Sequence, residues 1–401
     1  MDSLIKKAIK HILIVFFSLF RDILPKKNII IFSGINDITY NGNSRYLFEY
    51  LSTKKNYEVY WFTRSDIIKK HLKDNRMQYL SYNNPFKLIY KSFFMKIVFN
   101  DGDSYFNLFG LADSKNTYKI SLFHGYGPKT TIAALGNSSE IKSRINKINK
   151  FNYVNFTSEH TANHLSKNVF HLPHNKVRIL GFPKMDLFYD KEYTENMLIN
   201  KSKLSELFPS RSKMSKLILY TPTWRPYDYN LPLLDVNNFN TSDFNKYLEE
   251  KDIYFIYSVH SANIPKKIIK NMSRILYINE AYPLYDTNEM MLEADILMND
   301  YSNTLVEYSV LARPQIFCIP DYEYYKKTKG FVEDFMNIMP GECFGTFTDL
   351  KDTLERICLN TEKYSAKFSD HRLGLLTKYY NLKDKRSVKN YETLIDKIFN
   401  T

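Results

Sequence analysis

Three polar residues in the C-terminal half of the chain have side chains and positions suited to holding phosphate. Asp300, Ser302 and Asn303 come directly after Ile296–Met298, an apolar run typical of a buried strand. All three residue types cap helix N-termini, so we expect a helix to begin here. Free backbone N–H groups at such a start bind phosphate. Glu307, further along that helix, would lie near ribose or glycerol hydroxyls, although an ordinary helix-surface glutamate is the alternative.

A second group with phosphate-binding chemistry follows the apolar run Leu217–Tyr220. Thr221, Thr223 and Arg225 supply two hydroxyls and a guanidinium, and these groups suit the oxygens of a pyrophosphate. The alternative is a structural turn in which Trp224 anchors the core. Because Trp224 is one of only two tryptophans and lies beside Arg225, we favour binding.

A residue suited to proton transfer ends another predicted strand, in the segment Ser121–Lys129. His124 can accept a proton near neutral pH, and the glycines beside it let the backbone approach a substrate closely. Lys129 can neutralise phosphate or can be a surface lysine. A strand-end histidine can also be structural, so the residues alone leave both readings open.

Buried apolar runs alternate with helical or loop segments along the chain, which is the pattern of doubly wound parallel sheets. We expect strands at 28–34, 58–62, 96–100, 118–123, 152–157, 177–180, 217–220, 254–259, 275–278, 296–298 and 315–319. The absence of a single G-x-G-x-x-G fingerprint favours two α/β domains over one dinucleotide fold. The expected boundaries are a helix over 1–27, domains over 28–195 and 210–380, and a C-terminal helix over 381–401.

The net charge of +13 predicts anionic partners. We find no nucleic-acid-binding module, so phosphorylated substrates and an anionic membrane surface are the better expectation. Cys318, Cys343 and Cys358 form neither a disulfide framework nor a metal motif. No paired carboxylates are committed to a metal ion, so we expect no bound metal and no other cofactor.

The N-terminal residues 1–27 combine Lys6, Lys7 and Lys10 with the apolar run Ile12–Phe17. This run is shorter than the roughly 20 residues that span a bilayer, and no small-residue cleavage site follows it. We therefore expect an amphipathic helix lying on the cytoplasmic leaflet. The alternative is a helix that packs on the protein itself.

Taken together, these segments resemble the CDP-glycerol glycerophosphotransferase family, whose members build teichoic acids and related bacterial capsules. The chain departs from the family pattern at Lys184, where arginine is usual, at Ser261, where proline is usual, and at Asn303, where serine is usual. The loop 40–45 matches only partly, because Gly42 replaces aspartate. The residues that carry the resemblance are His124–Lys129, Gly181–Asp186, Tyr220–Arg225, Asp300, Tyr301, Ser302, Glu307, Pro314, Asp321, Tyr325, Gly330 and Phe331.

The resemblance implies two Rossmann-like domains facing a cleft, as in GT-B glycosyltransferases. It implies that His124 is the general base and that His260 contacts donor phosphate or stabilises departing cytidine monophosphate. Asn43 and Arg45 would lie on the acceptor side. The donor-binding residues would be Lys129, Thr221, Thr223, Arg225, Asp300, Ser302, Asn303 and Glu307.

The implied reaction moves glycerol phosphate, or a related polyol phosphate, from a CDP-activated donor to a hydroxyl of a membrane-anchored glycan acceptor. Two alternatives stay open: a GT-B glycosyltransferase that uses a nucleotide-sugar, and a non-catalytic membrane-bound scaffold of the polymer pathway. The expected location is the cytoplasmic face of the bacterial membrane. The sequence leaves the polyol, the acceptor and the oligomeric state open.

Overall fold

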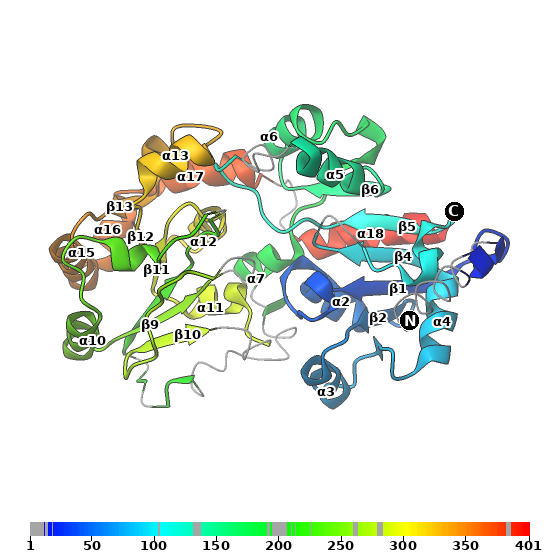
Figure 1. The fold of residues 1–401 in the computed structure, drawn as a ribbon, viewed down its shortest axis with the longest axis horizontal. Helices are drawn as coiled ribbons and strands as arrows, with labels where there is room; N and C mark the ends of the chain where they lie inside the picture. Colours follow the sequence, from blue (N-terminus) through cyan, green and yellow to red (C-terminus); the bar gives the residue numbers. More distant parts are fainter. Residues whose placement is uncertain are drawn as a thin grey trace, which may run out of the picture. The chain divides into compact units, whose positions relative to one another are not determined.

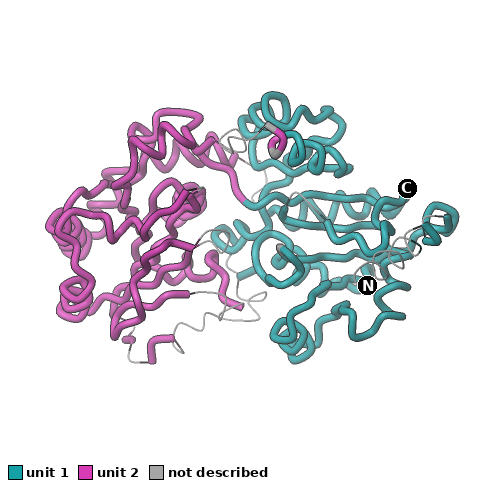
Figure 2. Tube along the Cα trace, viewed as in Figure 1, with its two compact units in different colours: residues 1–124, 142–199, 382–401 teal, residues 125–141, 200–381 magenta. Residues whose placement is uncertain are grey.

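The chain divides into two compact units in the computed structural model (Figure 2). Unit 1 comprises Met1–His124, Lys142–Ile199 and Leu382–Thr401, and unit 2 comprises Gly125–Ile141 and Asn200–Asn381. The chain therefore passes from one unit to the other four times, once directly after His124. The residues that the structure describes are 12, 15–17, 19–102, 105–130, 138–190, 193–194, 207–209, 211–212, 214–225, 227–259, 264–278, 284–381 and 386–401.

Unit 1 is built on a seven-stranded sheet with the strand order β3-β2-β1-β4-β5-β6-β7 (Figure 1). All neighbouring strands are parallel, and the apolar residues Ile29–Phe32 of β1 are fully buried. The order reverses between β1 and β4, which creates a switch point where open α/β sheets bind ligands. The strands are β1 (Lys27–Ser33), β2 (Glu58–Phe62), β3 (Tyr79–Leu80), β4 (Met95–Asn100), β5 (Tyr118–Ser121), β6 (Tyr153–Phe156) and β7 (Val177–Ile179).

Helices and short helical turns connect these strands (Figure 1). Ser65 and Ser158 cap α3 and α6 with their hydroxyls, as their residue type predicts. The α-helices are α2 (Gly42–Ser52), α3 (Asp66–Asp74), α4 (Pro85–Phe94), α5 (Ser138–Ile148), α6 (Glu159–Ala162), α7 (Asp186–Tyr189) and α18 (Ser387–Phe399). The short turns are η1 (Ile35–Asp37), η2 (Leu108–Asp113), η4 (Asn163–Lys167), η5 (His174–Lys176) and η6 (Pro183–Met185).

Unit 2 is built on a six-stranded parallel sheet with the order β10-β9-β8-β11-β12-β13. Its switch point lies between β8 and β11. The strands are β8 (Lys216–Tyr220), β9 (Ile253–Ser258), β10 (Ile275–Ile278), β11 (Ile296–Asn299), β12 (Gln315–Phe317) and β13 (Gly341–Cys343). The helices are η7 (Pro232–Asp235), α10 (Thr241–Glu250), α11 (Thr287–Glu293), α12 (Thr304–Ser309), α13 (Tyr322–Thr328), α14 (Phe335–Ile338), α15 (Phe347–Leu359), α16 (Thr361–Ala366) and α17 (Ser369–Tyr379).

The C-terminal helix α18 packs in unit 1, although the sequence analysis treats 381–401 as a separate element. The buried carboxylate of Asp186 accepts hydrogen bonds from the backbone N–H groups of Ser387 and Val388, both at 2.9 Å. The hydroxyl of Tyr391 donates to the carbonyl oxygen of Gly181 at 3.3 Å. Asp186 therefore caps the N-terminus of α18.

The N-terminal segment is described only in part, so the amphipathic helix expected over 1–27 falls largely outside the described residues. Within the described part, Phe17 stacks on Phe109 with ring centroids 5.7 Å apart. The side chains of Ile12, Phe16 and Leu19 are exposed. Across the described residues, every helix falls short of the length and apolar character that crossing a bilayer would require.

Candidate functional site

The two predicted phosphate-binding segments of unit 2 lie side by side at the carboxyl edge of its sheet. Thr221–Arg225 follows β8 and Asp300–Asn303 follows β11, and these two strands pair directly across the switch point. The hydroxyl groups of Thr221 and Thr304 share a hydrogen bond of 2.8 Å. This is the position at which ligands of doubly wound sheets bind.

Asp300 holds the two segments together. Its buried carboxylate accepts hydrogen bonds from the backbone N–H groups of Thr223 at 2.8 and 2.9 Å and of Ser302 at 3.1 Å. It also accepts one from Nη1 of Arg225 at 2.5 Å. Asp300 therefore shapes the backbone of both segments, and direct contact between its side chain and a donor stays a prediction.

Arg225 connects a third segment to this group. Its Nε and Nη2 atoms donate to the two carboxylate oxygens of Asp321, both at 3.0 Å. Burial acts to lower the pKa of Arg225, but the carboxylates of Asp300 and Asp321 outweigh burial and raise the pKa well above its usual value. Burial also acts to raise the pKa of Asp321, and hydrogen bonds led by that from Arg225 reverse the effect. The guanidinium is thus engaged by two aspartates, and its contact with pyrophosphate stays a prediction.

Two polar atoms next to this ion-pair group have no hydrogen-bond partner among the described residues. They are the buried Oγ1 atom of Thr223 and the buried Oδ1 atom of Asn303. Ser302 is half-buried beside them, and Glu307 is buried in the first turn of α12. Because buried polar atoms are normally paired, these atoms mark a place where a ligand can supply the missing partners.

The segment Gly125–Thr130 belongs to unit 2 and lies against the same group. The carbonyl oxygen of Pro128 accepts a hydrogen bond from the backbone N–H group of Val332 at 2.7 Å, and Lys129 pairs with Phe331 in an antiparallel bridge. A Cβ atom on Gly127 would lie 2.5 Å from Oδ1 of Asn303, so a larger residue here would force the Asn303 side chain to shift.

Lys129 lies near acidic residues of the donor group. Burial lowers the pKa of Lys129, and the carboxylates of Asp300 and Glu307 oppose that effect. An ammonium group partly removed from water gains from an anionic partner, which fits the predicted phosphate-neutralising role. Contact of Lys129 with a phosphate stays a prediction.

His124 is the last residue of unit 1 and follows β5, one strand away from the switch-point strand β4. Its exposed ring stacks on Phe123 with centroids 5.0 Å apart. The Nδ1 atom lies 3.3 Å from the backbone carbonyl oxygen of Asp101, which can only accept a hydrogen bond. In the neutral ring Nδ1 is therefore the donor, and Nε2 carries the lone pair that could accept a proton.

The two residues predicted to lie on the acceptor side are both fully buried in α2. Arg45 forms an ion pair with Glu49 at 2.8 Å, and Tyr40 donates to the same carboxylate at 2.9 Å. Asn43 donates from Nδ2 to the carbonyl oxygen of Phe123 at 2.7 Å. Their contact with an acceptor stays a prediction, and the observed partners are those of a structural role.

The remaining expectations concern His260 and metal ions. His260 lies outside the described residues, which end at Val259 after β9. In the described part of the chain, no three histidine, cysteine, aspartate or glutamate side chains cluster in a way that could hold a metal ion.

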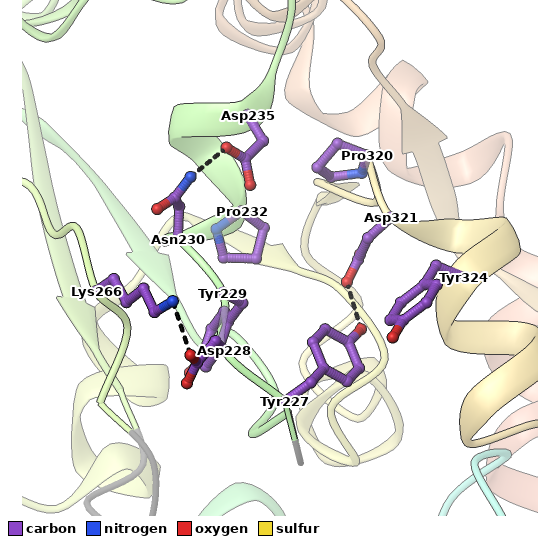
Figure 3. Close-up of a pocket in the computed structure, with 10 residues that line it drawn as sticks. All are labelled: Tyr227, Asp228, Tyr229, Asn230, Pro232, Asp235, Lys266, Pro320, Asp321 and Tyr324. Carbon is purple, nitrogen blue, oxygen red and sulfur yellow. Dashed lines mark hydrogen bonds and ion pairs between the residues drawn. The ribbon is translucent and has the colours of Figure 1, made fainter.

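A cavity of about 610 Å³, which the sequence did not predict, lies at the carboxyl edge of unit 2 (Figure 3). Asp321 forms part of its wall, where the Tyr227 hydroxyl donates to the carboxylate at 3.0 Å. On the opposite wall Lys266 forms an ion pair with Asp228 at 2.7 Å. The lining residues come from three segments of the chain. Asp321, which is part of the family pattern, was the only lining residue that the sequence had indicated. The lining residues are Tyr227, Asp228, Tyr229, Asn230, Pro232, Asp235, Lys266, Pro320, Asp321 and Tyr324.

The overall fold is similar to that of the wall teichoic acid polymerase TagF. The two structures superpose with a TM-score of 0.75 over 100% of this chain and 96% of that chain, at 18% sequence identity. This likeness confirms the predicted fold class of two α/β units with parallel sheets.

Curated relatives share more of the sequence. The chain is 29% identical over 262 residues to the teichoic acid glycerol-phosphate primase of Bacillus subtilis (strain 168), a match that covers 64% of each chain. It is 23% identical over 400 residues to the teichoic acid glycerol-phosphate transferase of Staphylococcus aureus (strain NCTC 8325 / PS 47), covering 95% of each. The teichoic acid ribitol-phosphate primase of Bacillus spizizenii (strain ATCC 23059 / NRRL B-14472 / W23) is 25% identical over 68% of this chain and 70% of that protein.

A family model described as CDP-Glycerol:Poly(glycerophosphate) glycerophosphotransferase matches residues 14–399, which is nearly the whole chain. The match includes every segment on which the resemblance was based. The chain therefore belongs to this family of glycerophosphotransferases.

Proposed function

We propose that the protein transfers glycerol phosphate, or a related polyol phosphate, from a CDP-activated donor to a hydroxyl of a teichoic acid acceptor or a related lipid-linked glycan. Family membership carries the proposal. Its relatives include transferases named for glycerol phosphate and for ribitol phosphate, so the test of the proposal compares donors that carry either polyol.

In the proposed reaction Nε2 of His124 takes the proton of the acceptor hydroxyl. The hydroxyl oxygen attacks the β-phosphorus, a new oxygen–phosphorus bond forms, and the bond to the bridging oxygen breaks. Cytidine monophosphate leaves with the bonding electron pair. Phosphoryl transfer of this kind needs positioning and charge neutralisation more than covalent chemistry.

The donor is held in this proposal by the convergent segments of unit 2. The Oγ1 hydroxyl of Thr223 would donate to a phosphate oxygen, and Oδ1 of Asn303 would accept a hydrogen bond from a polyol hydroxyl. Lys129 would neutralise phosphate charge. The Arg225 ion pairs would fix the surrounding loops. His260 is proposed, from the family resemblance alone, to stabilise the departing cytidine monophosphate.

The test is turnover of CDP-glycerol, CDP-ribitol and UDP-sugars with a defined lipid-linked acceptor. We expect cytidine monophosphate release and an acceptor whose mass increases by whole polyol phosphate units. His124→Ala should abolish transfer while leaving the melting temperature unchanged. Turnover of a UDP-sugar without turnover of either CDP-polyol would refute the proposal in favour of a glycosyltransferase. No turnover of any donor would favour a scaffold role for the protein. A fully active His124→Ala variant would refute the assignment of His124 as the general base.

We also propose that the protein works at the cytoplasmic face of the membrane, held there by its N-terminal segment. The exposed apolar side chains of Ile12, Phe16 and Leu19, together with the preceding lysines, support this. Co-sedimentation with vesicles containing anionic phospholipid should fall when Phe16 and Leu19 are both changed to serine. Equal binding by the variant and the parent protein would contradict the proposal.

A further inference from the structure

The backbone next to His124 is held in a conformation that an L-residue rarely adopts. Phe123 has a φ of 59°, in the left-handed region, and its side chain is buried. A phenylalanine persists in this region only where its surroundings hold it there, and such residues gather at functional sites. The question is which groups hold it.

Two buried polar side chains of unit 1 bind the two consecutive carbonyl groups that follow this strained torsion. Asn43 donates from Nδ2 to the carbonyl oxygen of Phe123 at 2.7 Å. Lys184 donates from Nζ to the carbonyl oxygen of His124 at 2.9 Å. Asn43 is fully buried, so its bond is shielded from competing water, whereas the bond of Lys184, which is 7% exposed, is partly buried.

The side chain of Asn43 also binds the segment that carries Lys184. The Oδ1 atom of Asn43 accepts a hydrogen bond from the backbone N–H group of Lys184 at 3.3 Å. Asn43 lies at the start of α2 and Lys184 lies in η6, so two elements far apart in the sequence converge on consecutive carbonyl groups. An ammonium group is costly to bury, and the carbonyl oxygen of His124 is one acceptor that offsets this cost for Lys184.

We propose that Asn43 and Lys184 are positioning residues for His124. They fix the Phe123 and His124 carbonyl groups, so that the ring keeps Nδ1 on the Asp101 carbonyl oxygen and Nε2 is the nitrogen that acts as the base. The inference rests on the proposed function, because it assigns these residues to the same transfer reaction. It also gives Lys184 a role at a position where the family pattern has arginine: either residue can donate to one carbonyl oxygen.

The test compares Lys184→Met, Lys184→Arg and Asn43→Ala with the parent protein. We expect kcat to fall by at least about tenfold in Lys184→Met and Asn43→Ala, since a misplaced catalytic group loses rate steeply. The KM for the donor should not change, because every residue predicted to bind the donor belongs to unit 2. Lys184→Arg should restore most of kcat.

The chain offers a matched control in Lys176. Its Nζ atom also donates to a backbone carbonyl oxygen of unit 1, that of Asn149, at 2.6 Å. Lys176→Met removes the same kind of bond away from His124 and should leave kcat unchanged. An equal loss of kcat in Lys176→Met and Lys184→Met would show that the loss reflects stability alone.

A spectroscopic measurement separates positioning from general loosening. In protein labelled with ¹³C and ¹⁵N at histidine, the His124 ring, assigned by its absence in His124→Ala, should show the Nδ1–H tautomer. Lys184→Met and Asn43→Ala should show a mixture of tautomers, and Lys184→Arg should not. A parent protein without transfer activity refutes the proposed function. An active parent whose Lys184→Met variant keeps kcat and tautomer refutes only the positioning role.

Discussion

At the scale of single residues, the family pattern in unit 2 is largely a pattern of mutual support. Arg225, Asp300 and Asp321 bind one another and the backbone, and they leave Thr223, Ser302 and Asn303 facing the place where ligand is expected. A motif residue can therefore be essential without touching substrate. Measurements of stability and of activity distinguish residues that support the site from residues that contact the substrate.

The buried ion pairs of Arg225 predict a large loss of stability in Arg225→Met. The variant leaves the carboxylates of Asp300 and Asp321 without their cation, which typically costs about 3–5 kcal/mol of unfolding free energy. Lys246→Met is the control, because Lys246 and Glu250 form an exposed pair 4.0 Å apart worth less than about 1 kcal/mol. Urea denaturation measures both, and equal losses would contradict the assignment.

The close approach of Gly127 to Asn303 predicts a loss of donor binding in Gly127→Ala. The added methyl group would lie 2.5 Å from Oδ1 of Asn303 and must displace it. We expect the KM for the donor to rise, on the order of tenfold. The double variant Gly127→Ala with Asn303→Gly should regain part of the parent protein's stability. Unchanged kinetics in the single variant would show that the segment moves freely.

At the scale of elements, short apolar runs predicted most strands and missed two. The predicted ranges 58–62 and 275–278 coincide with β2 and β10. The missed strands are β3 (Tyr79–Leu80) and β13 (Gly341–Cys343), which lie at sheet edges and are too short to carry an apolar pattern. α18 was predicted as a helix, but its attachment through Asp186 joins residues about 200 positions apart, which periodicity cannot reveal.

The cap of α18 predicts a pH-dependent stability of unit 1. Burial raises the pKa of Asp186 to about 7, although the two backbone N–H bonds favour its charged form. The folded state then binds the proton more tightly than the unfolded state. The contribution of protonated Asp186 to the free energy of unfolding is complete below about pH 4, which is the pKa of the group in the unfolded chain. This contribution is lost as the pH rises through about 7.

Asp186→Asn should therefore flatten this dependence, because asparagine does not titrate. Trp61 lies in unit 1 and Trp224 in unit 2, so fluorescence in a Trp224→Phe background reports on unit 1 alone. We expect the free energy of unfolding to fall between about pH 4 and pH 7 in the parent and to change less in the variant. Parallel pH profiles would assign the dependence to another group.

At the scale of the whole molecule, each unit is built from segments that are not continuous in the sequence. Two α/β regions were predicted from alternating strands and helices, and two are found. The sequence did not indicate that Gly125–Ile141 belongs with unit 2 or that Leu382–Thr401 belongs with unit 1. The contacts that decide this, such as Lys129 with Phe331 and Asp186 with Ser387, join distant residues whose pairing one sequence does not encode in any local pattern.

Because the units are interleaved in the sequence, we predict that dividing the chain between its two sheets gives fragments that each lack part of a unit. A fragment of residues 1–199 lacks α18 and leaves the buried carboxylate of Asp186 without its N–H donors, so we expect it to aggregate or unfold. The same fragment joined by a flexible linker to residues 382–401 should fold, as judged by circular dichroism and a cooperative melt. A fragment 1–199 that folds with equal stability would show that α18 is dispensable.

The segment Gly125–Thr130 also constrains how donor preference can be exchanged between relatives. A chimaera that imports only residues 200–381 would set the host's Gly127 against a foreign side chain at position 303, where the family pattern has serine. The residue at position 303 and the segment 125–130 form one exchangeable module, although more than 170 residues separate them in the sequence. Exchanging one continuous stretch of sequence, such as 200–381, would separate the two parts of this module. Exchanging position 303 together with the segment 125–130 would keep the module intact.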